Sequence, residues 1–470
     1  MKKAIQSLEE VRKTSADFSI NAEMFTPDIV ELRKKLRSNG YKPLAEFAKY
    51  IKRGSQPEYS TDGTIKALRS VNIRENGFSN DRQEFVTEDF YNKNPRMHIF
   101  KGDVLLNSTG VGTLGRCCFV FNNEKFVIDG HVTRISKLEE LSPEFLYVYL
   151  NSKYGQLQIN KLYKGSSGQI EIYPEQIQLI YIKPLKMQKL ISNLVQLSYQ
   201  YREKCIQYYK EANSYLKKEL TLNSEHLSHK LWFVKNYSDV KDANRFDAEY
   251  FQSKYDEIMN ILNKNGYTRL IDNFNIVRNS GLEYHEDGKI GVIKTKQIKD
   301  KFIDFNVESK TNLYEDNVIV KNKDVLFASM GVGSLGKTNI YYNFENNNEF
   351  IIDSTLKIFR KKINGSISPE LLEAYLHTQI AQELIYQNVV GSSGIISVYE
   401  SYLQELPIPI INNSVEQKIV ENIKTAHLLY YQSKQLLEIA KRGVEIAIEQ
   451  DENIATNWIN QELQKIGVEL

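Results

Sequence analysis

The chain has 470 residues, of which 41% are hydrophobic and 26% charged, and its formal net charge at pH 7 is +2. This composition is typical of a globular protein, and the length allows two to four domains. No apolar run approaches the roughly 20 residues of a membrane span, and the N-terminus lacks the apolar core of a secretion signal. Cys117, Cys118 and Cys205 have neither disulfide-framework nor zinc-site spacing. We therefore expect a cytoplasmic protein, and the near-neutral charge neither favours nor excludes a nucleic-acid partner.

The first half of the chain predicts a mixed α and β domain. A helix is expected from Pro27 to Leu36, followed by strands at Ile65–Val71 and Val104–Leu106. The stretches Phe119–Phe121 and Phe126–Ile128 lie on either side of Asn122 and Asn123 and predict a β-hairpin.

A second helix is expected to begin at Ser142-Pro143-Glu144, because Ser suits the N-cap and Pro the first helical position. A Pro-marked strand, Ile180–Pro184, closes this part. The second half predicts the same order, with a helix at Asp247–Leu262, a strand at Ile290–Ile293, a helix at Ser368-Pro369-Glu370 and a strand at Leu406–Pro409.

The two halves are copies of one pattern. Gly110-Val111-Gly112-Thr113-Leu114-Gly115-Arg116 recurs as Gly331-Val332-Gly333-Ser334-Leu335-Gly336-Lys337, and Gly165-Ser166-Ser167-Gly168 recurs as Gly391-Ser392-Ser393-Gly394. The offset of about 226 residues is far longer than the roughly 20–50 residues of solenoid or propeller repeats. It predicts two copies of a whole domain and a pseudo-twofold axis, a symmetry that suits two half-sites of a DNA duplex.

Each copy ends in a long helix with a heptad stripe, which predicts a coiled coil of about four heptads. Pairing of the two helices is favoured over packing of each helix on its own domain, because the stripes match in length. The seam residues are Leu190, Leu194, Leu197, Tyr201 and Tyr208 in the first helix and Ile419, Ile423, Tyr430, Leu437 and Val444 in the second.

The two Gly-x-Gly-x-x-Gly segments match the dinucleotide-binding fingerprint. That fingerprint requires the loop to open a helix whose N-terminus binds the pyrophosphate. Here Arg116 and Lys337 lead into β-rich sequence, so a turn between two strands is expected instead. Such a turn allows the backbone to approach a phosphate or a DNA groove, although a purely structural hairpin remains open.

Repeated polar positions supply candidate DNA contacts, since Arg and Lys suit guanine edges and Asn and Gln suit adenine. Each alone is more often solvated surface than a DNA contact. The candidates are Arg53, Ser55, Arg69, Asn72, Ser108, Thr109, Thr113, Arg116, Lys164 and Ser166 in the first copy and Arg278, Ser280, Lys294, Lys296, Gln297, Ser329, Ser334, Lys337 and Ser392 in the second. We predict no catalytic or metal-binding residues, because no methyltransferase, phosphate-loop, nuclease or histidine-cluster pattern occurs.

Together these motifs resemble the specificity (S) subunit of Type I restriction-modification systems over essentially the whole chain. The family patterns appear as Gly102-Asp103-Val104-Leu105-Leu106 leading to Gly115, as the Pro143–Leu150 helix, as Leu406-Pro407-Ile408-Pro409, as Glu416-Gln417-Lys418-Ile419 and as Arg245–Phe251. Copy one departs from them at Ile182–Leu185, at Met187–Leu190 and at Ser19–Phe25.

The resemblance implies an α+β fold with two pseudo-symmetric target recognition domains, each with a twisted, partly closed sheet. Two antiparallel coiled-coil spacer helices would join them, giving recognition domains at 1–185 and 223–411 and spacer helices at 186–222 and 412–470.

The resemblance also implies a role in defence against foreign DNA. The chain would be a non-catalytic subunit that binds a bipartite site in double-stranded DNA, one domain per half-site. It would dock two adenine-N6 methyltransferase (modification) subunits and, in some assemblies, two ATP-dependent motor-nuclease subunits. S-adenosylmethionine, ATP and Mg are expected on these partners, with no cofactor on this chain and no membrane contact. Two alternatives are the specificity partner of a two-part system with fused methyltransferase and nuclease, and a nucleotide-binding enzyme that uses the Gly-rich loops.

Overall fold

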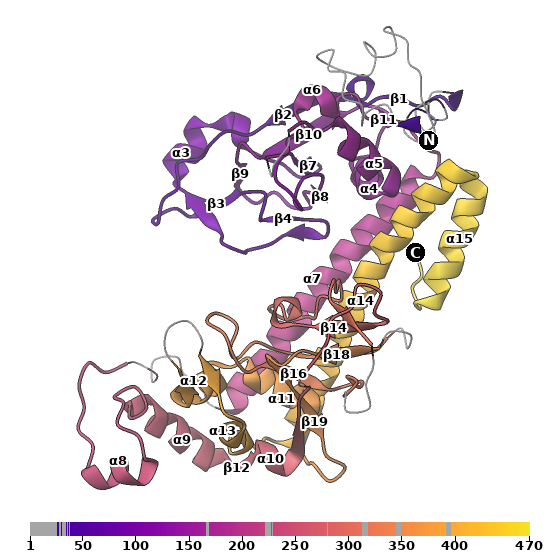
Figure 1. Cartoon of the computed structure of the whole chain (residues 1–470). Coiled ribbons are helices and arrows are strands. Elements are labelled where there is room, and N and C mark those ends of the chain that lie inside the picture. Colours follow the sequence, from indigo (N-terminus) through magenta and orange to yellow (C-terminus); the bar gives the residue numbers. More distant parts are fainter. Residues whose placement is uncertain are drawn as a thin grey trace. The chain divides into compact units, whose positions relative to one another are not determined.

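The computed structural model describes Thr26, Pro27, Val30, Lys34, Leu36 and Leu227 and the ranges 38–165, 169–220, 229–279, 281–312, 318–344, 349–391 and 396–470. The chain forms two compact units (Figure 1). Unit 1 comprises the chain up to Tyr201 together with Gln432–Leu470, and unit 2 comprises Arg202–Tyr431. The expected helix Pro27–Leu36 lies mostly outside the described residues. Among the described residues, no helix has the length and apolar character needed to span a bilayer.

Unit 1 contains a four-stranded antiparallel sheet in the order β2-β10-β7-β8, a three-stranded sheet in the order β6-β3-β9, and the strand pairs β1–β11 and β4–β5. The strands are β1 (Lys42–Pro43), β2 (Ala48–Arg53), β3 (Ile65–Leu68), β4 (Ile73–Arg74), β5 (Gly77–Phe78), β6 (Glu84–Val86), β7 (Val104–Asn107), β8 (Cys117–Phe119), β9 (Phe126–Ile128), β10 (Val132–Leu138) and β11 (Tyr181–Ile182). The shorter helices are η2 (Leu44–Glu46), α3 (Glu88–Lys93), η3 (Pro95–Met97), α4 (Pro143–Asn151), α5 (Lys153–Leu162) and α6 (Pro174–Ile177).

Unit 2 repeats the four-stranded sheet, the three-stranded sheet and the β1–β11 pair as β13-β19-β16-β17, β15-β14-β18 and β12–β22, and it contains the pair β20–β21 where unit 1 has β4–β5. The strands are β12 (Tyr267–Arg269), β13 (Phe274–Val277), β14 (Ile290–Ile293), β15 (Lys310–Thr311), β16 (Val325–Ala328), β17 (Thr338–Ile340), β18 (Phe350–Ile352), β19 (Leu356–Lys361), β20 (Val389–Val390), β21 (Ser397–Val398) and β22 (Pro407–Pro409). The shorter helices are α8 (Tyr237–Ala243), α9 (Ser253–Asn265), α10 (Leu270–Asn273), η5 (Thr295–Gln297), α11 (Pro369–Leu376), α12 (Gln379–Gln387) and α13 (Glu400–Gln404).

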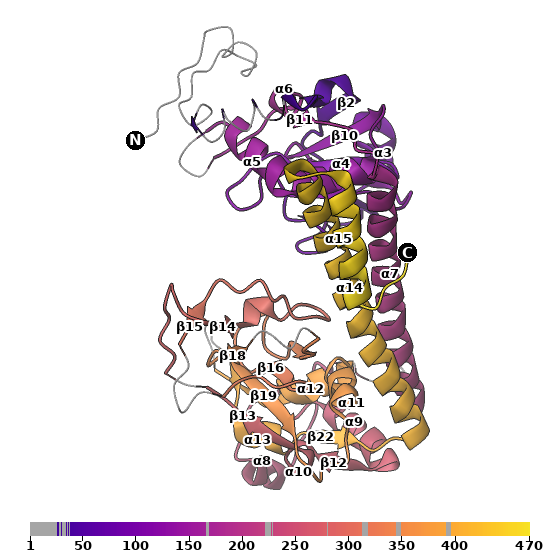
Figure 2. The same ribbon diagram turned by 90° about the vertical axis from the view of Figure 1, so that its right-hand side faces the viewer.

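The predicted Ser-Pro-Glu helix starts are confirmed. The Ser142 hydroxyl accepts a hydrogen bond from the Phe145 N–H at the start of α4, and Ser368 does the same for Leu371 at the start of α11. In unit 2 the apolar face of α11 packs in one core cluster with β16, β17 and β19, and Figure 2 shows this helix beside the sheet. The fold is therefore α+β, with open sheets rather than closed barrels.

The hairpin predicted around Asn122 and Asn123 is wrong. Strand β8 pairs antiparallel with β7, whereas β9 pairs parallel with β3, so the two strands flanking these residues enter different sheets. The parallel partner of β9 is about 60 residues away in the chain, which local turn residues cannot indicate.

The long helices are α7 (Gln188–Glu219) and α14 (Asn413–Glu449), and each unit contains one half of both. In unit 1 the Ser198 hydroxyl donates to the Ser433 carbonyl at 2.8 Å, and in unit 2 the Tyr209 hydroxyl lies 2.6 Å from His427 Nε2. Within unit 2, Glu219 accepts from the Asn412 N–H. In unit 2 the contact partner in or next to α14 falls from His427 to Asn412 as the residue number in α7 rises from 209 to 219, so the two helices are antiparallel.

The predicted seam residues lie in or beside this helix contact. The buried seam residues are Leu194, Ile419, Ile423, Leu437 and Val444. Half-buried and packed against the core are Leu190, Leu197, Tyr201, Tyr208 and Tyr430.

In α7, Ile191, Val195 and Tyr209, next to the predicted positions, are also buried. Helix α7 also contacts its own recognition domain, where Gln196 donates to Glu144 at 2.7 Å. Its buried face is therefore wider than a two-helix seam. The region expected as one C-terminal spacer helix contains α14 and a second helix, α15 (Glu452–Lys465), whose Ile459 joins the unit 1 core.

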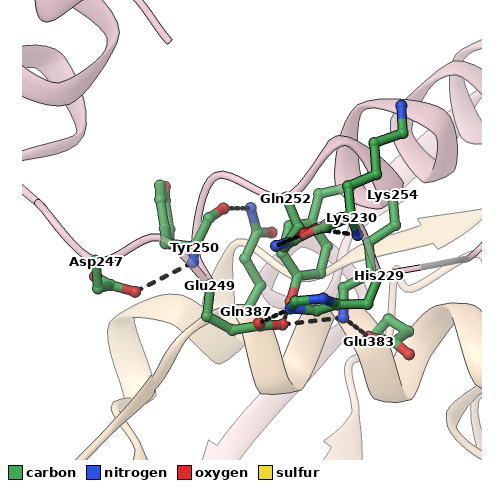
Figure 3. A network of polar contacts seen from close by, with 10 residues as sticks. His229, Lys230, Asp247, Glu249, Tyr250, Gln252, Lys254, Glu383 and Gln387 are labelled. Carbon is green, nitrogen blue, oxygen red and sulfur yellow. Dashed lines mark hydrogen bonds and ion pairs between the residues drawn. The ribbon is translucent and has the colours of Figure 1, made fainter. Parts of the chain in front are cut away.

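A polar network fixes the segment that precedes α9 in unit 2 (Figure 3). Lys254 forms ion pairs with Glu249 at 3.0 Å and with Glu383 of α12 at 2.8 Å. Gln387 of α12 donates to the Tyr250 carbonyl at 3.0 Å. The Arg245–Phe251 segment thus serves to attach the start of the second copy to α9 and α12.

Candidate nucleic-acid interface

The Gly-rich turn of unit 1, defined as residues 108–116, joins two antiparallel strands. Leu105 of β7 pairs with Cys118 of β8, and the turn between them is closed by hydrogen bonds from Leu114 N–H to Gly110 O and from Gly115 N–H to Asn107 O, both 2.9 Å.

The Gly-rich turn of unit 2, residues 329–337, repeats these bonds from Leu335 to Gly331 and from Gly336 to Ala328, again at 2.9 Å. Each turn leads into a strand and not into a helix, β8 after the first and β17 after the second. Neither turn therefore offers the helix N-terminus that a dinucleotide pyrophosphate needs.

The last glycine of each turn contacts a glutamine of a later helix, α5 in unit 1 and α12 in unit 2. Gln156 of α5 donates to Gly115 O at 2.9 Å and to Leu150 O at 2.8 Å, and Gln382 of α12 does the same for Gly336 O at 3.1 Å. Gly115 and Gly336 have φ of +85° and +84°, and a Cβ on Gly336 would lie 2.3 Å from Gln382 Oε1. The positive φ therefore favours glycine at this position, and a side chain on Gly336 would displace the end of Gln382.

Asn72 and Gln297, two of the candidate DNA contacts, are buried and hydrogen-bonded inside their own domains. Asn72 is fully buried, and its amide donates to Ser79 O at 3.0 Å and Asp81 O at 2.9 Å while accepting from the Arg69 N–H at 3.0 Å. Gln297 is 4% exposed and accepts from the Lys294 N–H at 3.1 Å in the same way. Both amides hold a loop closed from inside and have no edge available for DNA.

Ser108 and Ser329 are a second pair that belongs to the framework. Ser108 is fully buried, and its hydroxyl lies 2.5 Å from that of Thr133 on β10. Ser329 is 2% exposed and donates to the Thr355 carbonyl at 3.2 Å. These hydroxyls fix each Gly-rich turn to the neighbouring strand end, which corrects their expected role as DNA contacts.

Two cation–aromatic pairs occupy equivalent places in the two units. The Arg69 guanidinium lies 5.8 Å from the ring centre of Tyr59, and the Lys294 ammonium lies 4.1 Å from that of Tyr284. Arg69 also pairs with Glu84 at 3.6 Å. An aromatic face holds a cation at the surface without removing its charge. Neither tyrosine was among the residues predicted from the sequence, although each lies ten residues before its cation.

In unit 1 several polar side chains gather around Asp129. Its carboxylate accepts from the His131 N–H at 2.8 Å, and the His131 ring lies 2.9 Å from the Thr109 hydroxyl. Burial raises the pKa of the Asp129 carboxyl, and His131, Arg69 and Arg53 oppose this shift. Arg53 lies 3.8 Å from Glu171 and stacks over Tyr173 at 4.9 Å.

The ends of the Gly-rich turns carry the cations expected from sequence. Arg116 is half-buried, and burial together with the nearby Arg74 guanidinium lowers its pKa. Lys337 is exposed. In the described part of the chain, neither has a carboxylate within ion-pair distance, so both charges are available to an outside anion.

The remaining candidates divide by exposure. Ser55, Arg278 and Lys296 are exposed, with Lys296 paired to Glu308 at 2.7 Å. The half-buried ones are Thr113, Lys164 and Ser334. The Lys164 backbone pairs with Glu171, and the Thr113 hydroxyl donates to Thr109 O inside the turn. Ser166, Ser280 and Ser392 lie outside the described residues. In the described ranges, no His, Cys, Asp and Glu side chains gather as a metal-binding group.

Residues 38–197 match the model of the Type I restriction modification DNA specificity domain. The chain is similar to the S subunit of a Type I restriction-modification system from M. genitalium at 13% identity and a TM-score of 0.34, over 92% of this chain and 96% of that one.

It is also similar to the HsdS subunit from Thermoanaerobacter tengcongensis, at 15% identity and a TM-score of 0.27 over 90% and 95% of the two chains. A third similar structure, the type IIG restriction endonuclease BpuSI, has 13% identity and a TM-score of 0.28 over 41% and 30%. No curated protein sequence matches the chain. The family match covers residues 38–197, which lie in unit 1, and unit 2 repeats the four-stranded and three-stranded sheets of that unit.

Proposed function

We propose that the chain recognises a bipartite sequence in double-stranded DNA, with one recognition domain for each half-site. The observation that carries this proposal is a constant framework with changed polar side chains. Thr109 and Glu171 bridge in unit 1 where Met330 and Ser397 bridge in unit 2. Two domains that differ at such positions but share strands, turns and internal hydrogen bonds suit the reading of two different sequences.

The equivalent turns next to these bridges differ in the same way. His131 donates its N–H to Asp129 in unit 1, and Thr355 does so to Asp353 in unit 2. Imidazole and hydroxyl groups present different donors and acceptors to a base edge, while the backbone that carries them is the same. Arg116 and Lys337 would contact phosphate, which fixes position on the duplex but carries no sequence information.

We also propose that the chain docks two adenine-N6 methyltransferase subunits and, in a complete restriction complex, two ATP-dependent motor-nuclease subunits. S-adenosylmethionine, ATP and Mg would bind to those partners, and this chain would supply recognition alone. The antiparallel pair α7–α14 would set the distance between half-sites, since each unit contains half of both helices. The family match to a DNA specificity domain supports this reading over a nucleotide-binding enzyme.

A domain exchange tests the proposal. Leu44 N–H donates to Ile180 O, and Leu270 N–H donates to Leu406 O, so both domains close at the same point beside a strand pair. Residues 44–180 can therefore be replaced by 270–406 without cutting β1–β11. The hybrid should direct methylation to a symmetric, palindromic target made of two copies of the second half-site. Single-molecule sequencing of methylated adenines in the host would show it, and an unchanged asymmetric motif would contradict the assignment of one domain to each half-site.

A further inference from the structure

The tip of each Gly-rich turn carries an exposed valine. Val111 is 68% exposed and Val332 is 65% exposed, although each lies only three residues before a leucine that packs into the core. In both turns the valine stands between two glycines of positive φ: +93° and +76° around Val111, and +101° and +72° around Val332. Nothing in the described part of either unit covers these side chains.

The tips are rigidly held, so the exposure is built into the framework. The turn hydrogen bonds hold the backbone on both sides of each valine, and Leu335 anchors the second turn with 4% exposure. Gly110 and Gly331 are further fixed by N–H bonds to Ile170 O at 3.1 Å and Ile396 O at 2.9 Å. Valine itself is stiff because of its β-branch. A rigid, exposed apolar tip is the form expected of a contact residue and not of a mobile loop end.

The valine is the same in both units, whereas the side chains around it differ. Thr109 is replaced by Met330, Thr113 by Ser334 and Arg116 by Lys337. A residue that stays constant while its neighbours change should contact something that both half-sites share. The only apolar group on a base edge in the major groove is the thymine 5-methyl. Side chains that wedge between base steps are usually longer than valine, for example Phe, Leu or Met.

We propose that Val111 and Val332 each contact the 5-methyl group of a thymine in the major groove, so that each half-site contains an A·T pair at the position its turn reaches. This inference rests on the proposed DNA-recognition function. The flanking glycines leave room for the backbone to approach the bases, and the cation at the end of each turn lies near the same strand end for a neighbouring phosphate.

The test uses the assembled methyltransferase complex and its mapped target. Each thymine of the target duplex is replaced in turn by deoxyuridine, which removes only the methyl group, and affinity is measured by fluorescence anisotropy. For the parent complex, one position in each half-site should lose about fourfold in affinity, the value for burying one methyl-sized group. Val111→Ala should remove this loss in the half-site of the first domain only, and Val332→Ala in the other only.

A matched control is Val234→Ala, because Val234 is also exposed (86%) but lies outside both turns. It should leave both deoxyuridine penalties intact. The proposal is overturned if no deoxyuridine weakens the parent complex, or if the penalties persist in V111A and V332A. Failure of the proposed function would look different, since the parent complex would then show no preference for a bipartite target over unrelated DNA.

Discussion

Replacing Asn72 with alanine should open one loop of the first recognition domain without directly removing a DNA contact. The substitution deletes three hydrogen bonds, two from the side-chain amide to Ser79 O and Asp81 O and one from the Arg69 N–H to the side-chain oxygen. Each such bond contributes about 1 kcal/mol net, and the site is fully buried, so the expected cost is about 3 kcal/mol.

The second domain provides the matched variant. Gln297 makes the same bond to the Lys294 N–H, but its amide donates only to Asn306 O at 3.4 Å. Gln297→Ala should therefore cost about 1–2 kcal/mol. The difference between the two variants follows from the number and length of the side-chain hydrogen bonds.

Hydrogen exchange monitored by mass spectrometry is the suitable assay, because it reports the opening of each loop separately. A cost of about 3 kcal/mol corresponds to a loss of protection on the order of 100-fold for the amides of residues 69–83 in N72A. The loss in Q297A should be smaller and confined to residues 294–306. If N72A keeps parental protection while the methylated sequence changes at one base, Asn72 is a base reader and the framework role is refuted.

Arg116→Ala should reduce the slope of log binding constant against log salt concentration by about 0.9, the value for one phosphate contact, and Lys337→Ala should do the same. An unchanged slope in titrations of the assembled complex would leave the turn with a structural role only. Inserting seven residues after Tyr201 in α7 and seven after Tyr431 in α14 should keep the heptad phase and lengthen both helices by about 10.5 Å. At about 3.4 Å per base pair, the gap in the methylated motif should then grow by roughly three base pairs. Methylome sequencing that returns the parental gap at normal efficiency would exclude the spacer role. Burial raises the pKa of Asp129 in the folded state, because the buried carboxylate is less stable there than in water. The resulting loss of folding stability is absent below the unfolded pKa of about 3.9 and is reached in full as pH rises through the folded pKa. Asp129→Asn should therefore stabilise the protein more at pH 7 than at pH 4, and equal differences in urea midpoints at the two pH values would contradict this.

Local sequence signals determined the repeat, the helix starts and the Gly-rich turns. Ser142 and Ser368 cap helices because a hydroxyl before Pro-Glu satisfies an N–H of the first turn, whatever the helix later packs against. The turns were predictable as strand-to-strand connections, because β-rich sequence after Arg116 and Lys337 cannot supply a helix N-terminus. The α+β class and the antiparallel long helices agree with the fold that the family resemblance implied.

Only tertiary structure decided which polar side chains reach the surface. Asn72 and Ser108 carry the right groups for DNA but are buried, because Asn72 binds the Asp81 carbonyl across its loop and Ser108 contacts the Thr133 hydroxyl on β10. Tyr59 likewise contacts Arg69 only in the folded domain. Strand β9 pairs with β3, which lies much earlier in the chain, and therefore belongs to a different sheet from β8. Periodicity and capping act over a few residues and are written in the local sequence. Burial and strand pairing depend on contacts between segments far apart in the chain, and one sequence does not specify these in any local pattern.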